Sequence, residues 1–176
     1  GPELREQRHV AEGGKKPLGA FSGGVRQRVG IATALLGDPH IIVADEPTTG
    51  LDPQGRVTLR NLLSELATGR IVLLSTHIVS DVEAVAGRIL LLQGGRLLYN
   101  GAPADVLRAA QGRVWEYILP PGQIPPAEVT VSSLVQTADG VHVRAVAETP
   151  PVAGALSATA TLEDACLSVL KGGGLQ

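Results

Sequence analysis

Residues 41–53 read Ile-Ile-Val-Ala-Asp-Glu-Pro-Thr-Thr-Gly-Leu-Asp-Pro, an apolar run that ends in two adjacent carboxylates. The β-branched residues of this run predict a short strand that is buried on both faces. Ligands of open α/β sheets bind beyond the carboxyl ends of the strands. We therefore expect Asp45 and Glu46 at a ligand-binding edge, where two adjacent carboxylates favour Mg²⁺. The alternative is a pair of solvated acids that cap a helix.

The segments on either side of this strand are typical of helices and of a second strand. Apolar residues recur at helical spacing from Val25 to Leu36 and from Leu59 to Leu66. Gly37-Asp38-Pro39 is expected to end the first helix, and Gly69 the second. Residues 71–75, Ile-Val-Leu-Leu-Ser, predict another buried strand. Because strands and helices alternate, we expect an α/β protein with a mainly parallel sheet covered by helices.

Two further local patterns follow this strand. Ser80-Asp81-Val82-Glu83 has the spacing of a capping box and predicts a helix that runs to about Ala86. Gly94-Gly95 separates the runs 89–92 and 96–99, and two glycines in that position predict a hairpin.

Residues 111–176 have a different character. Prolines between residues 120 and 126 interrupt any regular element and predict a linker or a stiff excursion. Asp139-Gly140 predicts the turn of a hairpin. Thr161 is expected to cap a helix whose apolar face lies within residues 162–170. We therefore expect a small α+β C-terminal domain after the α/β part.

The composition excludes several protein classes. The chain has 176 residues, which fits one ordinary domain or one domain with a small appendage. Its 22 Gly and 12 Pro follow no period, and its hydrophobic share of 44% argues against wholesale disorder. The net charge of −2 provides no basic surface for nucleic acid. Cys166 is the only cysteine, so neither an internal disulfide nor a cysteine-based zinc site can form. No apolar run is long enough for a membrane helix, and the N-terminus lacks the apolar stretch of a secretory signal.

The N-terminal residues carry a second candidate motif. Glu3–Glu12 is consistent with a short helix, residues 13–17 with a loop, and Gly1-Pro2 with a scar of protease cleavage. Phe21-Ser22-Gly23-Gly24 directly precedes the helix predicted from Val25. Two glycines let the backbone approach a ligand, and a helix N-terminus offers free N–H groups to an anion. The alternative is a simple helix cap.

His77 follows the predicted strand 71–75, so it reaches the same edge as Glu46 if the two strands are parallel. Taken alone it could be structural, and Leu51-Asp52-Pro53 alone could be a turn. The order and spacing of the five motifs together resemble the ATP-binding-cassette (ABC) ATPase family. The motifs are Phe21-Ser22-Gly23-Gly24, the helix after it, the apolar strand with Asp45-Glu46-Pro47, Gly50-Leu51-Asp52, and the strand with Ser75-Thr76-His77.

The resemblance covers about residues 20–110 and implies roles for individual residues. Ser22, Gly23 and Gly24 look like the signature motif, which contacts the γ-phosphate of ATP bound by the opposite protomer. Val25 stands where the family often has Gln, which removes one possible polar contact. Asp45 resembles the aspartate that holds Mg²⁺, mostly through water.

The other roles belong to catalysis and to the dimer interface. Glu46 resembles the catalytic glutamate that polarises the attacking water, and His77 the switch histidine that touches the γ-phosphate. Residues 50–52, with Asp52 among the residues that bind the nucleotide, look like the loop that crosses the dimer interface. These are positioning and electrostatic roles, as phosphoryl transfer requires.

Three features of the family are missing from the 176 residues. The Gly-x-x-x-x-Gly-Lys-Ser/Thr loop that cradles phosphates has only Gly14-Lys15 as a candidate, with His9 in place of the first glycine and Lys16 in place of Ser/Thr. The Gln-bearing segment and the aromatic residue that stacks on adenine are missing too. The resemblance therefore implies the C-terminal half of a nucleotide-binding domain, in a partial P-loop NTPase sheet with helices.

The resemblance implies a division of the chain into three parts, and it implies how the isolated chain should behave. Residues 1–20 would be a remnant of the helical subdomain, 21–110 the half domain, and 111–176 the accessory domain. We expect the 176 residues alone to bind MgATP weakly or not at all and to be inactive; submicromolar ATP binding in calorimetry would refute this. Uncovered strand edges also predict oligomers, so a strict monomer in light scattering would count against that expectation.

The C-terminal part is similar to the tail of bacterial ABC-2-type exporter ATPases, on the strength of Arg113-Val114-Trp115-Glu116 and residues 161–167. The similarity implies a homodimer or a second cassette and a separate transmembrane permease, with the chain in the cytoplasm at the inner face of the cell membrane. The alternative is a non-catalytic module that supplies the signature motif in trans or only mediates dimerisation.

Overall fold

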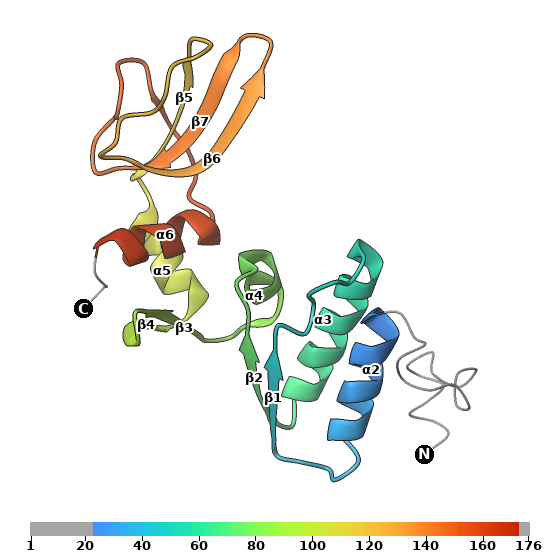
Figure 1. Ribbon diagram of the computed structural model, residues 1–176. Coiled ribbons are helices and arrows are strands. Elements are labelled where there is room, and N and C mark those ends of the chain that lie inside the picture. The colour runs from blue at the N-terminus through green and yellow to red at the C-terminus, as the bar shows by residue number, and fades with distance from the viewer. Residues whose placement is uncertain (1–22, 173–176) are drawn as a thin grey trace. The chain divides into compact units, whose positions relative to one another are not determined.

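A computed structural model describes residues 23–172 of the chain (Figure 1). The helix predicted over Glu3–Glu12 and the residue Ser22 lie outside the described residues. The described chain forms two compact units, and the boundary between them in the sequence falls between Val85 and Ala86. This division differs from the domain boundary predicted after residue 110, and the three-part domain assignment stays a prediction.

The first unit alternates helices and strands in the predicted order. It contains α2 (Gly23–Ala34), β1 (Ile41–Asp45), α3 (Pro53–Ala67), β2 (Ile71–Ser75) and α4 (Val79–Val85). Strands β1 and β2 are parallel, and their register places Ile41 opposite Ile71 and Asp45 opposite Ser75. Helices α2 and α3 lie side by side (Figure 1). The α/β class expected from the sequence is confirmed.

The core of this unit lies between the strands and the helices on one side of them. Leu51, Leu59 and Leu63 are buried there, and Ile31 of α2 with Val72 and Leu74 of β2 pack against them. Such a core forms because the leucines of α3 recur at helical spacing and face the sheet.

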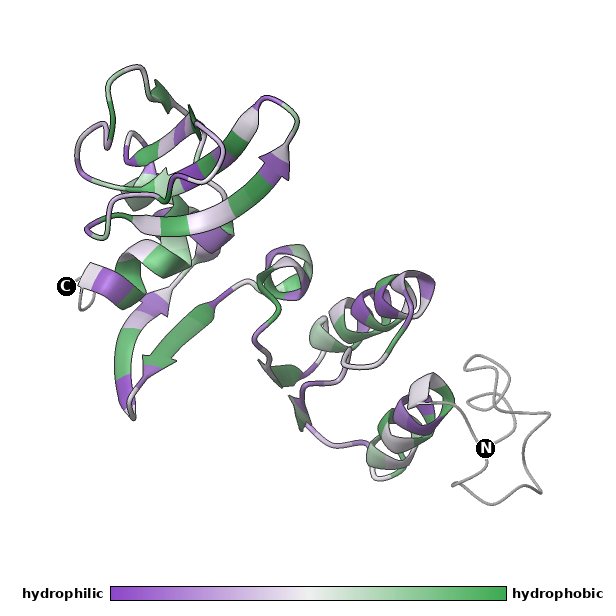
Figure 2. Cartoon of the chain, turned by 45° about the horizontal axis from the view of Figure 1, so that its top comes forward, coloured by the Kyte–Doolittle hydropathy of each residue, from purple (hydrophilic) through white to green (hydrophobic). Residues whose placement is uncertain are grey.

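The prediction that both strands are buried on both faces is wrong for the described structure. Val43 is 70% exposed and Ile71 is 64% exposed, whereas Ile42 is buried. Successive side chains of a strand point to opposite faces, and among the described residues the helices cover only one face. Figure 2 shows the hydrophobic colour of both strands. Apolar periodicity predicted the strands but could not say what covers their second face.

Two helix starts differ from the predictions. Helix α2 begins at Gly23 rather than Val25, so both glycines belong to its first turn. Helix α4 begins at Val79, so Ser80 lies inside the helix and the predicted capping box is not formed. The side chain of Asp81 is instead buried and accepts a hydrogen bond from Thr48.

The second unit begins with a hairpin of β3 (Ile89–Gln93) and β4 (Arg96–Gly101), which are antiparallel. Gly94 and Gly95 form the turn with φ angles of 56° and 75°, values that other residues rarely adopt. The predicted hairpin is confirmed. Helix α5 (Pro103–Ala110), which the sequence analysis did not predict, follows it.

The rest of this unit is an antiparallel sheet with a helix. The strands are β5 (Val114–Leu119), β6 (Thr130–Thr137), β7 (Gly140–Val146) and β8 (Leu156–Ser157), in the order β6-β7-β5-β8, and the helix is α6 (Leu162–Gly172). The hairpin predicted at Asp139-Gly140 is confirmed as the β6–β7 connection. The proline-rich residues 120–126 form an excursion between β5 and β6 rather than a linker between units.

Helix α6 is tied to the sheet by a buried carboxylate. As predicted, Thr161 precedes the helix and caps it: its Oγ1 accepts from the Asp164 N–H at 3.3 Å, and its own N–H donates to Asp164 Oδ2 at 2.8 Å. Arg144 of β7 donates to both oxygens of the same carboxylate, from Nε at 3.3 and 3.1 Å and from Nη2 at 2.7 Å. Asp164 is 1% exposed, so this charge is compensated where water cannot reach it.

None of the helices described between residues 23 and 172 has both the length and the apolar character that crossing a bilayer requires.

Candidate functional site

The carboxyl ends of the parallel strands β1 and β2 bring the predicted site residues together. Asp45 ends β1 directly opposite Ser75, the last residue of β2, and the Ser75 hydroxyl donates a hydrogen bond to Asp45 Oδ1. The next residue, Glu46, donates its backbone N–H to the Ser75 carbonyl at 2.9 Å. The ends of β1 and β2 are thus adjacent and hydrogen-bonded, as expected for one shared edge of the sheet.

Glu46 is paired with His77 in this site. The His77 Nδ1 atom lies 2.7 Å from Glu46 Oε1, and the His77 backbone N–H donates to the same oxygen at 3.0 Å. The other carboxylate oxygen, Oε2, accepts from the hydroxyls of Thr76 at 3.2 Å and Thr49 at 3.3 Å. Both oxygens of Glu46 are therefore held, and the residues that hold them come from the segments that follow β1 and β2.

The backbone of Glu46 is in an unusual conformation. Its φ angle is 44°, in the left-handed region that residues with a β-carbon rarely occupy. The Glu46 carbonyl accepts the Thr49 N–H at 3.2 Å, which closes a tight turn. Such strain persists only where the surrounding contacts fix it, and it is frequent at functional sites. The turn lets the carboxylate of Glu46 reach toward His77.

The surroundings of Glu46 also set its charge. The hydrogen bond with the His77 side chain, against a smaller opposing effect of burial, lowers the pKa of the Glu46 carboxyl below its usual value. The His77 backbone N–H and the Thr76 hydroxyl act in the same direction. Glu46 is therefore a carboxylate at neutral pH. The side chain of His77 is 77% exposed, against 34% for Glu46, so the imidazole is open to a ligand from solvent.

The loop after Glu46 lies against the start of α2. A β-carbon on Gly24 would come within 3.0 Å of Leu51 Cδ2, and one on Gly23 within 3.8 Å of the Gly50 carbonyl oxygen. Gln27 donates from Nε2 to the Thr49 carbonyl at 3.1 Å. The glycines that were predicted to approach a ligand are thus close to the loop at residues 49–51.

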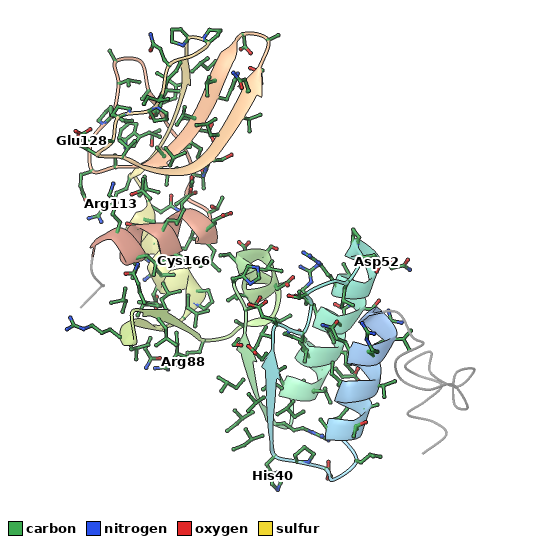
Figure 3. All side chains as sticks on the ribbon, viewed as in Figure 1. His40, Asp52, Arg88, Arg113, Glu128 and Cys166 are labelled. Carbon is green, nitrogen blue, oxygen red and sulfur yellow. The ribbon has the colours of Figure 1, made fainter. Side chains whose placement is uncertain are left out.

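Asp52 has a structural contact in the described chain. Its carboxylate accepts the Gly55 N–H at 2.8 Å, so Asp52 caps helix α3, whose first residue is Pro53. Figure 3 labels Asp52 at this helix start and His40 beside the opposite end of β1. The cap is compatible with a nucleotide-binding role, which stays a prediction for Asp52 as it does for residues 22–24.

A model of the family described as "ABC transporter" matches residues 3–49. The chain is 38% identical over 129 residues to an uncharacterized ABC transporter ATP-binding protein of Synechocystis sp., over 73% of this chain and 36% of that protein. It is 38% identical over 112 residues to Nod factor export ATP-binding protein I of Burkholderia pseudomallei, over 63% of this chain and 37% of that protein. The chain belongs to the ABC transporter ATP-binding protein family. It is also 34% identical over 113 residues to the uncharacterized ABC transporter ATP-binding protein YxlF of Bacillus subtilis, over 64% of this chain and 38% of that protein.

The chain spans about a third of the length of the curated relatives that it matches. ABC ATPases as a family bind and hydrolyse ATP, with Mg²⁺ as the usual metal ion.

The residues at the edge fit a magnesium ion that is shared with phosphate. Asp45 is exposed at the end of β1, and carboxylate oxygen is a ligand that Mg²⁺ prefers. The part of the chain that the structure describes has no group of three or more His, Cys, Asp or Glu residues that could enclose a metal. Mg²⁺ usually takes only one or two carboxylates and fills its other positions with water and substrate phosphates. A single carboxylate at an open edge meets this requirement.

Several contacts around the candidate site were not predicted from the sequence. These contacts are those of Thr49 and Thr76 with Glu46, of Gln27 with the loop, and of Thr48 with Asp81. A hydroxyl residue next to His77 and another three residues after Glu46 were a signal for the first two contacts. The contact of Thr48 with Asp81 spans 33 residues and left no local pattern.

Proposed function

We propose that these residues form the hydrolytic part of the ATP-binding subunit of an ABC exporter. The observation that supports this most is the ionised Glu46 carboxylate, held by His77 at the carboxyl edge of a parallel sheet. Open α/β sheets bind ligands at this edge. Hydrolysis of a phosphoanhydride needs a group that orients water and a donor that meets developing negative charge.

In this proposal the two side chains have complementary roles. Glu46 orients the attacking water and polarises it with its negative charge. With both ring nitrogens protonated, His77 would donate to Glu46 from Nδ1 and to the γ-phosphate from Nε2 on the exposed side of the ring, and its backbone N–H keeps Glu46 in place. Asp45 would hold Mg²⁺, which supplies charge neutralisation on the phosphates when it is bound. Ser75 restrains the Asp45 carboxylate.

The remaining site residues are proposed to act across a dimer. Ser22, Gly23 and Gly24 would contact the ATP of the opposite protomer through a hydroxyl and the N–H groups at the start of α2. Residues 50–52 would cross the interface beside them, consistent with the short distances from Gly23 and Gly24 to this loop. The dimer is either a homodimer or a pair with a second cassette.

The proposal includes export through a separate permease. One relative carries export in its printed name, "Nod factor export ATP-binding protein I". For this chain we propose a transmembrane permease as partner, a position in the cytoplasm at the inner face of the membrane, and no nucleic-acid partner.

A non-catalytic role is the second candidate. The chain would then supply residues 22–24 in trans to an intact cassette, or occupy a dimer interface without turnover. Adding the chain to an intact cassette with a defective signature motif separates these two non-catalytic roles. Only a chain that supplies residues 22–24 in trans restores the ATP turnover of that cassette. The retained pair of Glu46 and His77 favours the catalytic proposal, since a module that never hydrolyses ATP has no use for it.

The proposal is tested by His77→Ala in the full-length gene product that carries these residues. We expect ATP turnover to fall about 10²-fold, because one donor to the transition state is lost. The matched control is His40→Ala, which removes an exposed histidine beside the other end of β1 and is expected to leave turnover unchanged. Phosphate release at saturating MgATP measures both. Equal turnover of His77→Ala and wild type would contradict the role proposed for His77, whereas a wild type without turnover would favour the non-catalytic role.

A further inference from the structure

A buried polar pair links the two segments that carry Glu46 and His77. The Thr48 hydroxyl donates to Asp81 Oδ2 at 2.6 Å, and both residues are 1% exposed. Thr48 lies two residues after Glu46, and Asp81 lies four residues after His77. The hydrogen bond therefore joins the loop after β1 to helix α4 after β2, beneath the exposed site.

The pair is surrounded by further contacts of the same unit. The Arg60 guanidinium of α3 approaches Asp81 Oδ1 to 3.5 Å, and its Nη1 donates to the Ser80 carbonyl at 3.3 Å. Among the described residues Oδ1 accepts no hydrogen bond, so the Thr48 hydroxyl is the one short contact of this carboxylate. Burying a carboxylate is unfavourable unless such contacts compensate it.

We infer that Thr48 and Asp81 are positioning residues, whose buried hydrogen bond sets the relative placement of Glu46 and His77. The inference rests on the proposed function for its effect on turnover, but the geometric link stands by itself. Neither residue reaches the site edge, because both are buried. They act through the backbone: the strained turn at Glu46 is followed at once by Thr48, whose side chain is fixed to α4.

The distances at the edge explain why such a link matters. Glu46 Oε1 meets two donors of His77, at 2.7 and 3.0 Å, and both contacts depend on how far the segment after β2 lies from the turn after β1. Misplacing a catalytic group by about 1 Å can cost roughly 10²-fold in rate. Releasing the Thr48 hydroxyl from Asp81 removes the buried restraint on that separation.

The test compares three substitutions of Thr48. Thr48→Val keeps the shape and removes the donor, Thr48→Ala removes the donor with less bulk, and Thr48→Ser keeps the donor. In the full-length gene product we expect the first two to lower kcat about 10- to 100-fold with little change in KM for ATP. We expect Thr48→Ser to stay near the wild-type kcat, which a role of bulk packing alone does not predict.

A second measurement does not depend on activity. In the 176-residue chain, the amide of His77 should exchange with solvent about tenfold faster in Thr48→Val, while the amide of Leu63 in α3 keeps its rate. Unchanged kcat and unchanged His77 exchange would overturn the inference. It is also overturned if neither Thr48→Val nor Thr48→Ala folds, because the pair then serves stability alone. If the wild type lacks ATPase activity, the proposed function fails while the exchange measurement still decides the inference.

Discussion

Replacing Glu46 with glutamine is expected to lower the ATP turnover of the full-length gene product about 10³-fold while ATP remains bound. A positioned carboxylate that handles the proton of attacking water contributes roughly 10²- to 10⁴-fold to a rate. Glutamine has the same shape, and its carbonyl oxygen can still accept the His77 N–H that Glu46 accepts at 3.0 Å. The substitution therefore removes the negative charge and leaves the turn in place. Phosphate release and nucleotide retention on a filter measure the two parts of the result.

The matched control is Glu83→Gln, which neutralises an exposed glutamate of α4 in the same unit. We expect the control to turn over ATP at the wild-type rate, because Glu83 is not among the residues that hold the site. If Glu46→Gln is as active as this control, Glu46 has no part in hydrolysis. If it binds no ATP at all, the assigned role in orienting water is wrong.

The second large effect concerns stability. Asp164→Asn is expected to lower the free energy of unfolding of the second unit by about 3 kcal/mol at pH 7, since breaking one side of a buried ion pair leaves Arg144 poorly compensated. Urea unfolding followed by the fluorescence of Trp115, the only tryptophan, measures it. Glu163→Gln is the control, because Glu163 is exposed on the same first turn of α6. Equal stability of Asp164→Asn and the control would contradict the assigned role of the pair.

The same carboxylate predicts a pH dependence. Burial raises the pKa of Asp164, but the hydrogen bonds from Arg144 and Thr161 outweigh it and lower the pKa from 3.8 to about 2. A lowered pKa stabilises the folded state above the unfolded-state value, and this contribution is lost as the pH falls from about 4 through about 2. The shift of the pKa corresponds to a contribution of about 2 kcal/mol to the free energy of unfolding. The wild type should lose this increment in acid, and Asp164→Asn should not.

Local patterns predicted the elements of this chain well because the patterns are periodic. The leucines of α3 repeat at helical spacing, and the runs 41–45 and 71–75 are short apolar runs that begin with β-branched residues, a pattern typical of buried strands. Glycine pairs and Asp-Gly marked both hairpins, since their turns need positive φ angles. Because β1 and β2 proved parallel, the expectation that Asp45, Glu46 and His77 share one edge also held.

Long-range contacts explain what the sequence could not reveal. Gly23 and Gly24 suggested a turn before a helix, yet they lie inside α2, where Gly24 leaves room for Leu51 to approach closely. Ser80 suggested a helix cap, yet the helix starts earlier, at Val79. In both cases the deciding neighbour lies far away in the chain, and local spacing carries no information about it.

A double-mutant cycle between Glu46 and His77 tests whether these two side chains act as one unit in ATP hydrolysis, as their 2.7 Å contact suggests. The ATP turnover of the full-length gene product is measured for wild type, Glu46→Gln, His77→Ala and the double variant. We expect a double variant about as slow as Glu46→Gln alone, near 10³-fold below wild type, because the effects of residues that act as one unit are not additive. A loss near 10⁵-fold, the product of independent single effects, would contradict it.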